Sequence, residues 1–269
     1  MIDAASTMDA DLDRRFSGLA RLYGVAGAAR IRAAHVVVVG IGGVGSWAVE
    51  ALARSGVDRL TLIDLDHIAE SNINRQVHAV DATLGQAKVL AMRERIAQIN
   101  PDSRVRCIEE FVEPGNWPAL LDDPAMGPPD AVIDACDQIS AKLAMALWAR
   151  AAKTCFVSVG AAGGKRHAHK VDVADLAETT HDPLLASLRY RLRREHGAPR
   201  EGKKIGITCV FSREAVQQTD PSCAVDGQDN SLNCHGYGSV VSVTATFGQC
   251  AAGSVLDQLA HGCDRSAGL

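Results

Sequence analysis

The 269-residue chain lacks several features that would define its class at once. Its eight cysteines include no Cys-x-x-Cys pair, so we expect no structural zinc, and the chain is too long for a small disulfide scaffold. Only 4% of the residues are aromatic, and the net charge of −4 excludes a globally basic nucleic-acid binder. The acidic N-terminus has no apolar stretch of the signal-peptide kind, so the expected compartment is the reducing cytoplasm.

Residues 230–256 lack Asp, Glu, Lys and Arg, and this stretch is long enough to cross a bilayer. However, ten of the 21 residues in 236–256 are Gly, Ser, Thr or Gln. Small residues allow helices to approach closely. We therefore expect a buried or subunit-packing helix here and no membrane insertion.

Apolar runs alternate with helical segments as far as Gly160, and 47% of the chain is hydrophobic. This alternation predicts an α/β fold with a Rossmann-like, doubly wound, mostly parallel sheet. We expect N-terminal helices in residues 1–34, broken at Gly24, a nucleotide-binding core in 35–160, and a C-terminal elaboration of the same domain in 161–269. The core strands are predicted at 35–40, 59–64, 104–108, 131–135 and 155–160, and its helices at 44–55, 86–100 and 140–152. The elaboration adds a strand at 169–173, a basic helix at 182–196 and the small-residue helix.

A glycine-rich loop follows the first predicted strand and opens a helix. Its glycines are Gly40, Gly42, Gly43 and Gly45. Backbone N–H groups at such a helix start bind phosphate, because glycine lets the anion approach and the helix dipole favours it. Asp64, nineteen residues after Gly45, is placed to accept hydrogen bonds from a ribose. These residues alone fit a nicotinamide dinucleotide equally well.

Charged residues downstream of this loop distinguish a nucleoside triphosphate from a nicotinamide dinucleotide. Arg75 and Lys88 suit a triphosphate, because each offsets phosphate charge. Asp137 follows a predicted strand and suits Mg²⁺, which takes one or two carboxylates plus phosphate oxygens. Taken singly, the two cations could be solvated and Asp137 could be the N-cap of the next helix. Together they favour a site for ATP and Mg²⁺.

The whole set resembles the ubiquitin-activating-enzyme-like superfamily, which includes the MoeB and ThiF adenylating enzymes. The resemblance implies ATP, Mg²⁺, a homodimer, and attack of a carboxylate on the α-phosphate to give an acyl-adenylate. It assigns Arg75, Lys88 and Asp137 to catalysis, with Asp137 on the metal. It also assigns the loop glycines, Asp64, Asp66, Asn72, Arg75 and Lys88 to ATP binding.

The resemblance fails at one position near the N-terminus. Superfamily members carry an arginine there that reaches the partner subunit's ATP, whereas this chain has Gly18. Arg15 or Arg21 would have to make that contact instead.

Further stretches between residues 14 and 257 resemble one branch of the superfamily, the tRNA threonylcarbamoyladenosine dehydratases. They are residues 16–24, 41–54, 74–79, 160–164, 175–177, 181–184, 209–212 and 243–248. The resemblance implies adenylation of the threonyl carboxylate of N6-threonylcarbamoyladenosine at position 37 of tRNA, then ring closure by the carbamoyl group with release of AMP. It also implies a link to a cysteine desulfurase and its sulfur acceptor. The alternatives are an adenylating enzyme for the C-terminal glycine of a ubiquitin-like sulfur carrier, an NAD-dependent oxidoreductase, and a non-enzymatic sulfur-relay protein.

A basic segment, residues 189–204, carries seven basic and two acidic residues. It either contacts tRNA phosphates or forms a solvated helix face. The candidate tRNA contacts are Arg189, Arg191, Arg193, Arg194, Lys203 and Lys204.

Cys234 lies in a glycine-rich stretch beside His235, a setting that can activate a thiol for sulfur or nucleophilic chemistry. Ring closure within the substrate needs no protein nucleophile, so a bystander role is the competing interpretation. The sequence leaves both open.

Overall fold

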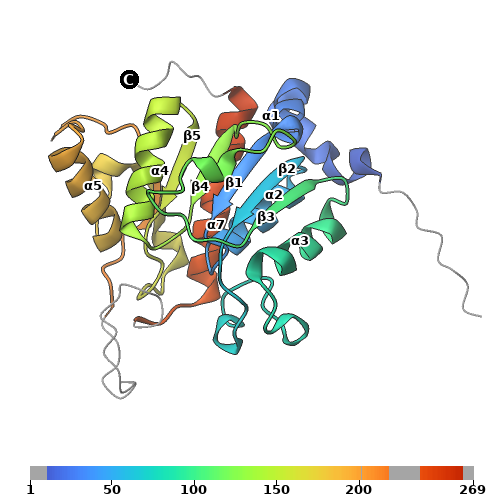
Figure 1. Cartoon of the computed structure of the whole chain (residues 1–269), viewed down its shortest axis with the longest axis horizontal. Helices are drawn as coiled ribbons and strands as arrows, with labels where there is room; N and C mark the ends of the chain where they lie inside the picture. Colours follow the sequence, from blue (N-terminus) through green and yellow to red (C-terminus); the bar gives the residue numbers. More distant parts are fainter. Residues whose placement is uncertain (1–10, 201, 218–236, 263–269) are drawn as a thin grey trace, which may run out of the picture.

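The structure is a computed structural model that describes residues 11–200, 202–217 and 237–262. Its centre is a seven-stranded sheet in the order β3-β2-β1-β4-β5-β7-β6 (Figure 1). Every neighbouring pair is parallel except β6 and β7. The predicted α/β fold with a doubly wound, mostly parallel sheet is therefore confirmed. The strands are β1 His35–Val39, β2 Arg59–Ile63, β3 Arg104–Ile108, β4 Ala131–Asp134, β5 Cys155–Val159, β6 Val171–Asp175 and β7 Thr208–Ser212.

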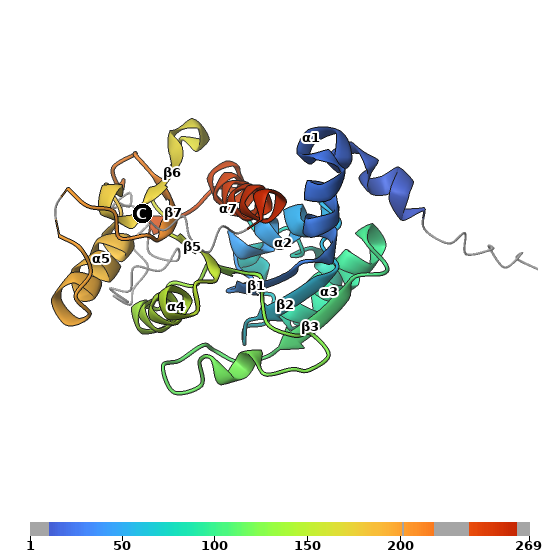
Figure 2. The same ribbon diagram turned by 90° about the horizontal axis from the view of Figure 1, so that it is seen from above.

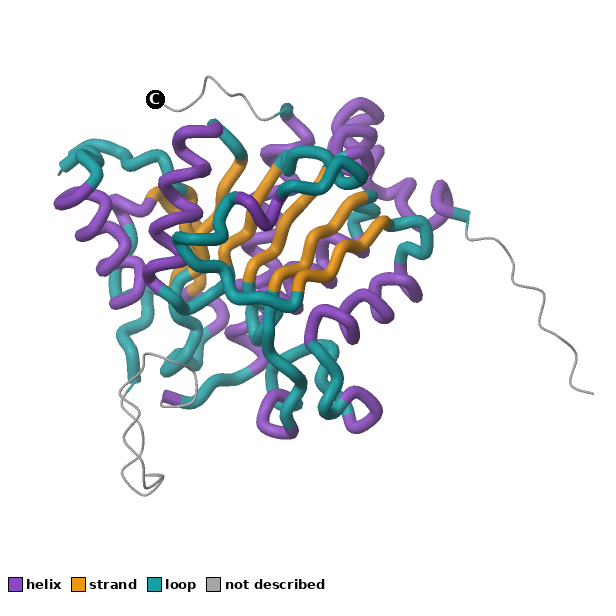
Figure 3. Tube along the Cα trace, in the orientation of Figure 1, coloured by secondary structure: helices purple, strands orange, loops and turns teal. Residues whose placement is uncertain are grey.

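Helices cover both faces of this sheet (Figure 2). One face packs against α1 Leu12–Ala33, α2 Gly45–Arg54, α3 Lys88–Ile99 and α7 Val241–His261. The other packs against α4 Ile139–Ala152 and α5 Pro183–Glu195. Figure 3 shows the strands in orange with the helices and their connecting loops around them. Short 3₁₀ helices occupy the connections: η1 Glu70–Asn72, η2 Asp81–Thr83, η3 Ala119–Leu121, η4 Ala168–Lys170 and η5 Leu176–Glu178.

The environment of strand β1 explains why apolar and polar residues do not alternate in its sequence. All five of its residues are buried. Val36 and Val38 belong to the core under α2 and α7, whereas Val37 and Val39 belong to the core under α4 and α5. A strand covered on both faces needs apolar residues at consecutive positions, so a continuous run of β-branched residues results.

The structure adds one strand that the sequence analysis did not predict. β7 lies between β5 and β6, parallel to β5 and antiparallel to β6. The predicted strand 169–173 begins only at Val171, because η4 occupies the three residues before it. The break in the N-terminal helix is where it was predicted, at Gly24, whose φ of 72° interrupts α1.

Helix α7 packs inside the molecule, as its small residues predict. A Cβ on Gly248 would lie 2.5 Å from the carbonyl oxygen of Val44 and 2.8 Å from Cβ of Trp47. Only glycine therefore allows α7 to lie this close to the start of α2. Among the described helices, none combines the length and apolar character needed to cross a membrane.

Candidate active site

The glycine-rich loop joins β1 to α2 at the carboxyl edge of the sheet, next to the point where the strand order reverses between β1 and β4. Gly40 has a φ of 86°, and a Cβ there would lie 2.8 Å from the carbonyl oxygen of Ala135. A Cβ on Gly45 would lie 1.8 Å from the carbonyl oxygen of Gly40. A Cβ on Gly42, in contrast, would have no heavy atom of the described residues within 4 Å. The loop is thus packed tightly at Gly40 and Gly45 and has space at Gly42, which suits the close approach of a phosphate to the backbone.

Asp64 directly follows β2 and is held against this loop. Its Oδ2 accepts a hydrogen bond from the backbone N–H of Ile41 (2.6 Å), and its Oδ1 accepts one from Asp66 (2.8 Å). Burial raises the pKa of the Asp64 carboxyl above its ordinary value, although Lys88 and these two N–H groups oppose the shift. Each carboxylate oxygen can accept a further bond, so Asp64 remains suited to a ribose hydroxyl.

Lys88 is the first residue of α3 and is only 6% exposed. Its Nζ lies 2.6 Å from Oδ2 of Asp66, whose side chain is half exposed. The backbone N–H of Lys88 also donates to the carbonyl of Asp66 (3.0 Å). The interpretation of Lys88 as a solvated cation is therefore wrong. It is a cation held at the carboxyl edge of β2 by one acidic partner.

Arg75 is also buried, with 8% exposure, so the solvated interpretation fails for it too. Its Nη1 donates to the carbonyl of Ser71 (2.6 Å) and to Oδ1 of Asn74 (2.9 Å). Its Cγ would lie 3.3 Å from a Cβ on Gly43, which places the side chain against the glycine-rich loop. Arg75 and the open loop therefore belong to one site.

Asn72 supports the turn that presents Arg75. It is buried, and its Oδ1 accepts a hydrogen bond from the N–H of Ala69 (3.1 Å), closing η1. Its carbonyl accepts from the backbone N–H of Arg75 (3.1 Å). The contacts seen for Asn72 thus build the backbone between Ala69 and Arg75.

Asp137 lies exposed in the connection from β4 to α4. The N-cap of α4 is Gln138, so the interpretation of Asp137 as that N-cap is wrong. It lies two residues beyond Ala135, whose backbone Gly40 contacts, so it belongs to the connection that borders the glycine-rich loop. The residues that the structure describes contain no group of three or more metal-capable side chains. A Mg²⁺ ion at Asp137 would accordingly depend on phosphate oxygens and water for its other ligands, which is how proteins usually bind it.

A buried ion pair beneath this connection was missed by the sequence analysis. Asp134 and Lys142 are both fully buried, with Nζ 3.0 Å from Oδ2. Nζ also donates to the carbonyl of Val159 (2.7 Å), and the hydroxyl of Ser158 donates to Oδ2 of Asp134 (2.7 Å). Although burial opposes its charge, the Asp134 carboxylate leaves the pKa of Lys142 above the ordinary value. The pair ties the end of β4 to α4 and β5, and so fixes the connection that carries Asp137.

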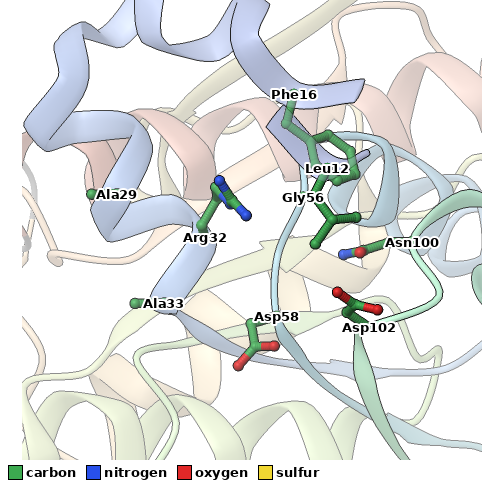
Figure 4. A pocket seen from close by; sticks show the side chains of 9 residues that line it. All are labelled: Leu12, Phe16, Ala29, Arg32, Ala33, Gly56, Asp58, Asn100 and Asp102. Atoms are coloured by element: carbon green, nitrogen blue, oxygen red, sulfur yellow. The ribbon is translucent and has the colours of Figure 1, made fainter. Parts of the chain in front are cut away.

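The two N-terminal arginines lie away from this site within the chain. Arg15 donates from Nη1 to the carbonyl of Ile99 (2.7 Å), at the end of α3, and Arg21 is exposed on α1 just before the kink. Their contact with a partner's ATP stays a prediction. A cavity of about 390 Å³ lies near Arg15, between α1 and the loops that enter β2 and β3 (Figure 4). It is at the amino edge of the sheet, opposite the glycine-rich loop.

The six basic candidates for tRNA contact divide into two groups. Nη1 of Arg189 donates to the carbonyls of Leu176 and Thr179, and Nε of Arg193 donates to the carbonyl of Pro199 (3.1 Å). These two therefore brace the chain around α5. Each of the remaining four is itself exposed or contacts an exposed side chain.

In that second group, Arg191 lies 3.5 Å from Glu195, one turn along α5. Arg194 donates to the hydroxyl of Tyr190 (2.7 Å), and both side chains are exposed. Lys203 and Lys204 are exposed as well. A tRNA role for the segment stays a prediction, and Cys234 lies outside the described residues.

Comparison with known proteins gives matches over most of the chain. The ThiF family matches residues 14–266. The chain is 42% identical over 254 residues to a tRNA threonylcarbamoyladenosine dehydratase of Escherichia coli, covering 91% of this chain and 93% of the relative. It is 40% identical over 250 residues to one of Haemophilus influenzae, covering 92% and 94%. A crystal structure of the E. coli dehydratase in complex with ATP superposes with a TM-score of 0.82 at 39% identity, covering 97% of this chain and all of that one.

Proposed function

Since the chain belongs to the ThiF family, as its motifs predicted, we propose that it is an ATP-dependent tRNA threonylcarbamoyladenosine dehydratase. It would cyclise N6-threonylcarbamoyladenosine at position 37 of tRNA with net loss of water. The observation that carries the proposal is the meeting of Arg75, Lys88 and Asp64 around an open glycine-rich loop. A relative that matches 97% of the chain is known with ATP bound.

The chemistry needs positive charge near the α-phosphate. A threonyl carboxylate oxygen attacks the α-phosphorus, pyrophosphate leaves, and an acyl-adenylate forms. The carbamoyl group of the same side chain then attacks the acyl carbon, the bond between that carbon and the phosphate oxygen breaks, AMP leaves, and the proton lost by the carbamoyl group passes to water. Arg75 and Lys88 would stabilise the phosphate charge that develops in the first step.

Both cations already have protein partners, and this determines how they would act. The phosphates would draw Lys88 from Asp66, which is half exposed and can turn towards water. Among the residues that the structure describes, Arg75 donates through Nη1 alone, to Ser71 and Asn74, so the N–H groups of Nε and Nη2 are available for phosphate. It would therefore bind phosphate without giving up the contacts that orient it.

Asp137 would hold a Mg²⁺ ion at this site, in keeping with its exposed carboxylate in the connection after β4. The ion would supply further positive charge to the phosphate oxygens. The Asp134–Lys142 pair would keep the Asp137 connection in place when the nucleotide enters.

The rival functions are less well supported. An enzyme that activates a ubiquitin-like sulfur carrier would share the ATP site, but the two dehydratases match more than nine tenths of the chain at 40–42% identity. A nicotinamide-dependent oxidoreductase has no use for two buried cations beside the loop. A sulfur-relay protein built on Cys234 has no use for the ATP-type site.

We also propose a homodimer working in the cytoplasm, with a cysteine desulfurase and its sulfur acceptor as further partners to be tested. Leu22 and Val25 are 74% and 80% exposed on either side of the α1 kink, next to Arg21. Burial of these side chains against a second subunit would bring Arg21 to the partner's surface. Light scattering of wild type and Leu22→Glu tests the dimer, and co-purification with a desulfurase tests the sulfur partners.

The deciding experiment measures AMP release from ATP with tRNA that carries the modified adenosine and with tRNA that lacks it. We expect release only with the modified tRNA. Asp137→Ala should abolish turnover or weaken ATP binding, whereas Asp102→Ala, at the opposite edge of the sheet, should leave both unchanged. Equal AMP release with both tRNAs, or tight NAD binding without ATP binding, would refute the function.

A further inference from the structure

We propose that a second cavity, beside the start of α5, binds the purine base of the modified nucleotide. This inference rests on the function proposed above. The cavity has a volume of about 260 Å³. It is lined by Thr179, Thr180, His181, Asp182, Pro183, Ala186, Arg189, Ala215 and Val216.

The cavity lies at the same edge of the sheet as the glycine-rich loop. Strand β7 runs parallel to β5, and β5 runs parallel to β4, so all three end at that edge. Ala215 and Val216 follow the carboxyl end of β7. Asp182 accepts a hydrogen bond from the N–H of Ala161 (2.9 Å), just beyond the carboxyl end of β5. A molecule in the cavity can therefore reach toward the ATP site along one edge.

The distance along this edge suits the substrate. Two strand intervals separate β4, which precedes Asp137, from β7, which precedes the cavity. At about 4.8 Å per interval, the ends of β4 and β7 are about 10 Å apart, and the end of β1, which precedes the glycine-rich loop, is one interval farther, about 14 Å from β7. The threonylcarbamoyl group extends from the purine like about two residues of extended chain, or roughly 7 Å. A base in the cavity would therefore direct the threonyl carboxylate along this edge, over more than half of the distance to β4, toward phosphates bound between the ends of β4 and β1.

The lining suits a flat ring with polar edges. Pro183, Ala186 and Val216 supply apolar walls, and the buried Thr179 and Asp182 supply polar groups. Enzymes that act on an unstacked base commonly hold it in this way, between apolar side chains and hydrogen-bonding groups. Pockets for drug-sized ligands usually have volumes of roughly 300 Å³ or more, so a smaller cavity suits one ring system rather than a whole nucleotide.

The polar groups of the cavity are already fixed in place. The two carboxylate oxygens of Asp182 accept from the N–H groups of Leu185 and Ala161, and its burial raises the pKa of the carboxyl. Nη1 of Arg189 donates hydrogen bonds to the carbonyl oxygen of Thr179 (3.0 Å) and to the hydroxyl oxygen of the same residue (2.7 Å). A guanidinium held in one plane is a good surface for stacking a base.

His181 marks the rim of the cavity with an unusual backbone. Its φ is 56°, a left-handed value that is uncommon outside glycine. Its carbonyl accepts a hydrogen bond from Nζ of Lys165 (2.9 Å), which helps to hold this conformation. Such conformations persist where the surroundings enforce them, and they cluster at ligand sites. The rim is thus pre-shaped, with an exposed imidazole beside the opening.

The cavity also connects to the basic segment along α5. Pro183, Ala186 and Arg189 are spaced three residues apart, so they lie on one face of the helix. The exposed Tyr190 and Arg194 continue from this region toward the end of α5. Position 37 lies in an unpaired loop, where bases can be splayed out and stacked. The base would enter the cavity while the flanking phosphates run toward Arg194.

The test compares binding of an anticodon stem-loop RNA with and without the modified adenosine, in the absence of ATP. Wild type should bind the modified loop at least about tenfold tighter, a difference of about 1.4 kcal/mol. Ala186→Leu fills the cavity and should bring the two affinities within about threefold while ATP affinity stays unchanged. Ser187→Leu, one position along the helix and outside the lining, should keep the discrimination.

A second filling variant, Ala215→Leu, guards against local misfolding of α5 and should act like Ala186→Leu. If both variants keep wild-type discrimination and the wild-type KM for modified tRNA, the cavity does not bind the base, and the proposed function stands. If wild type releases no AMP with modified tRNA, the proposed function fails, and the assignment of the cavity falls with it.

Discussion

His78 makes the folded protein sensitive to acid. It lies three residues after Arg75, is only 3% exposed, and within the described part of the chain neither ring nitrogen has a hydrogen-bond partner. Burial first, and then the charges of Lys88 and Arg95, lower the pKa of His78 from 6.5 to about 4. The imidazole is therefore neutral in the folded state at any pH near neutrality.

The sign of the effect follows from the two pKa values. Between pH 6.5 and about 4 the unfolded chain binds a proton that the folded chain does not, so stability falls as the pH falls. One pKa unit corresponds to about 1.4 kcal/mol. Lowering the pH from about 7.5 to about 5 should therefore lower the free energy of unfolding by about 2 kcal/mol through His78 alone. Above pH 6.5 the contribution is fully present and nearly constant.

Urea unfolding of wild type and His78→Leu at about pH 7.5 and about pH 5 measures this contribution. Leucine replaces the titrating ring with an apolar side chain at this position. On acidification, the free energy of unfolding of the variant should therefore fall by about 2 kcal/mol less than that of wild type. Other titrating groups contribute equally to both proteins and cancel in the comparison. His196→Gln, at the exposed C-cap of α5, is the matched control and should follow wild type. Equal losses in wild type and His78→Leu would refute the reasoning.

Three further predictions concern activity. Arg75→Ala and Lys88→Ala should each lower AMP formation by about a hundredfold to a thousandfold while changing ATP affinity far less, because their contacts strengthen as charge develops; unchanged turnover in both would remove them from the site. Arg194→Glu with Lys203→Glu should raise the KM for tRNA, leave ATP affinity intact and lower the salt dependence of binding; an unchanged salt slope would identify a solvated face. Cys234→Ser should still cyclise modified tRNA, because the substrate carries its own nucleophile and intramolecular attack has a large effective molarity. A variant that folds and forms the adenylate but does not cyclise the substrate would instead establish a covalent intermediate on Cys234.

The residues around the glycine-rich loop were predictable because their signals are local. Gly40 and Gly45 follow a buried strand directly, and their backbone positions leave no room for a side chain. Asp64 directly follows the next strand, and a strand end in a parallel sheet determines where the following residue lies. Sequence order alone therefore predicts that these residues meet at one edge.

Other features depend on contacts between distant segments, which the sequence pattern does not reveal. Strand β7 is five residues long and is defined by pairing with β5 and β6, both earlier in the chain. Lys142 lies on a helix where a cation usually faces water, yet it is fully buried because Asp134 and the carbonyl of Val159 receive its ammonium. In both cases the structure depends on contacts with other segments of the chain. Neither β7 nor the helix around Lys142 carries a periodic sequence pattern that indicates those contacts.

The close packing of α7 on α2 also bears on how the protein is made. Gly248 rests on the turn that starts α2, and the hydroxyl of Thr244 lies 3.5 Å from the carbonyl oxygen of Arg75. These contacts join residues about 170 to 200 positions apart, which is the kind of pairing that folds slowly. While α7 is still inside the ribosome, the side of α2 that packs against α7 has no cover. The nucleotide loop is thus encoded early in the chain but reaches its final support only when the last helix has emerged.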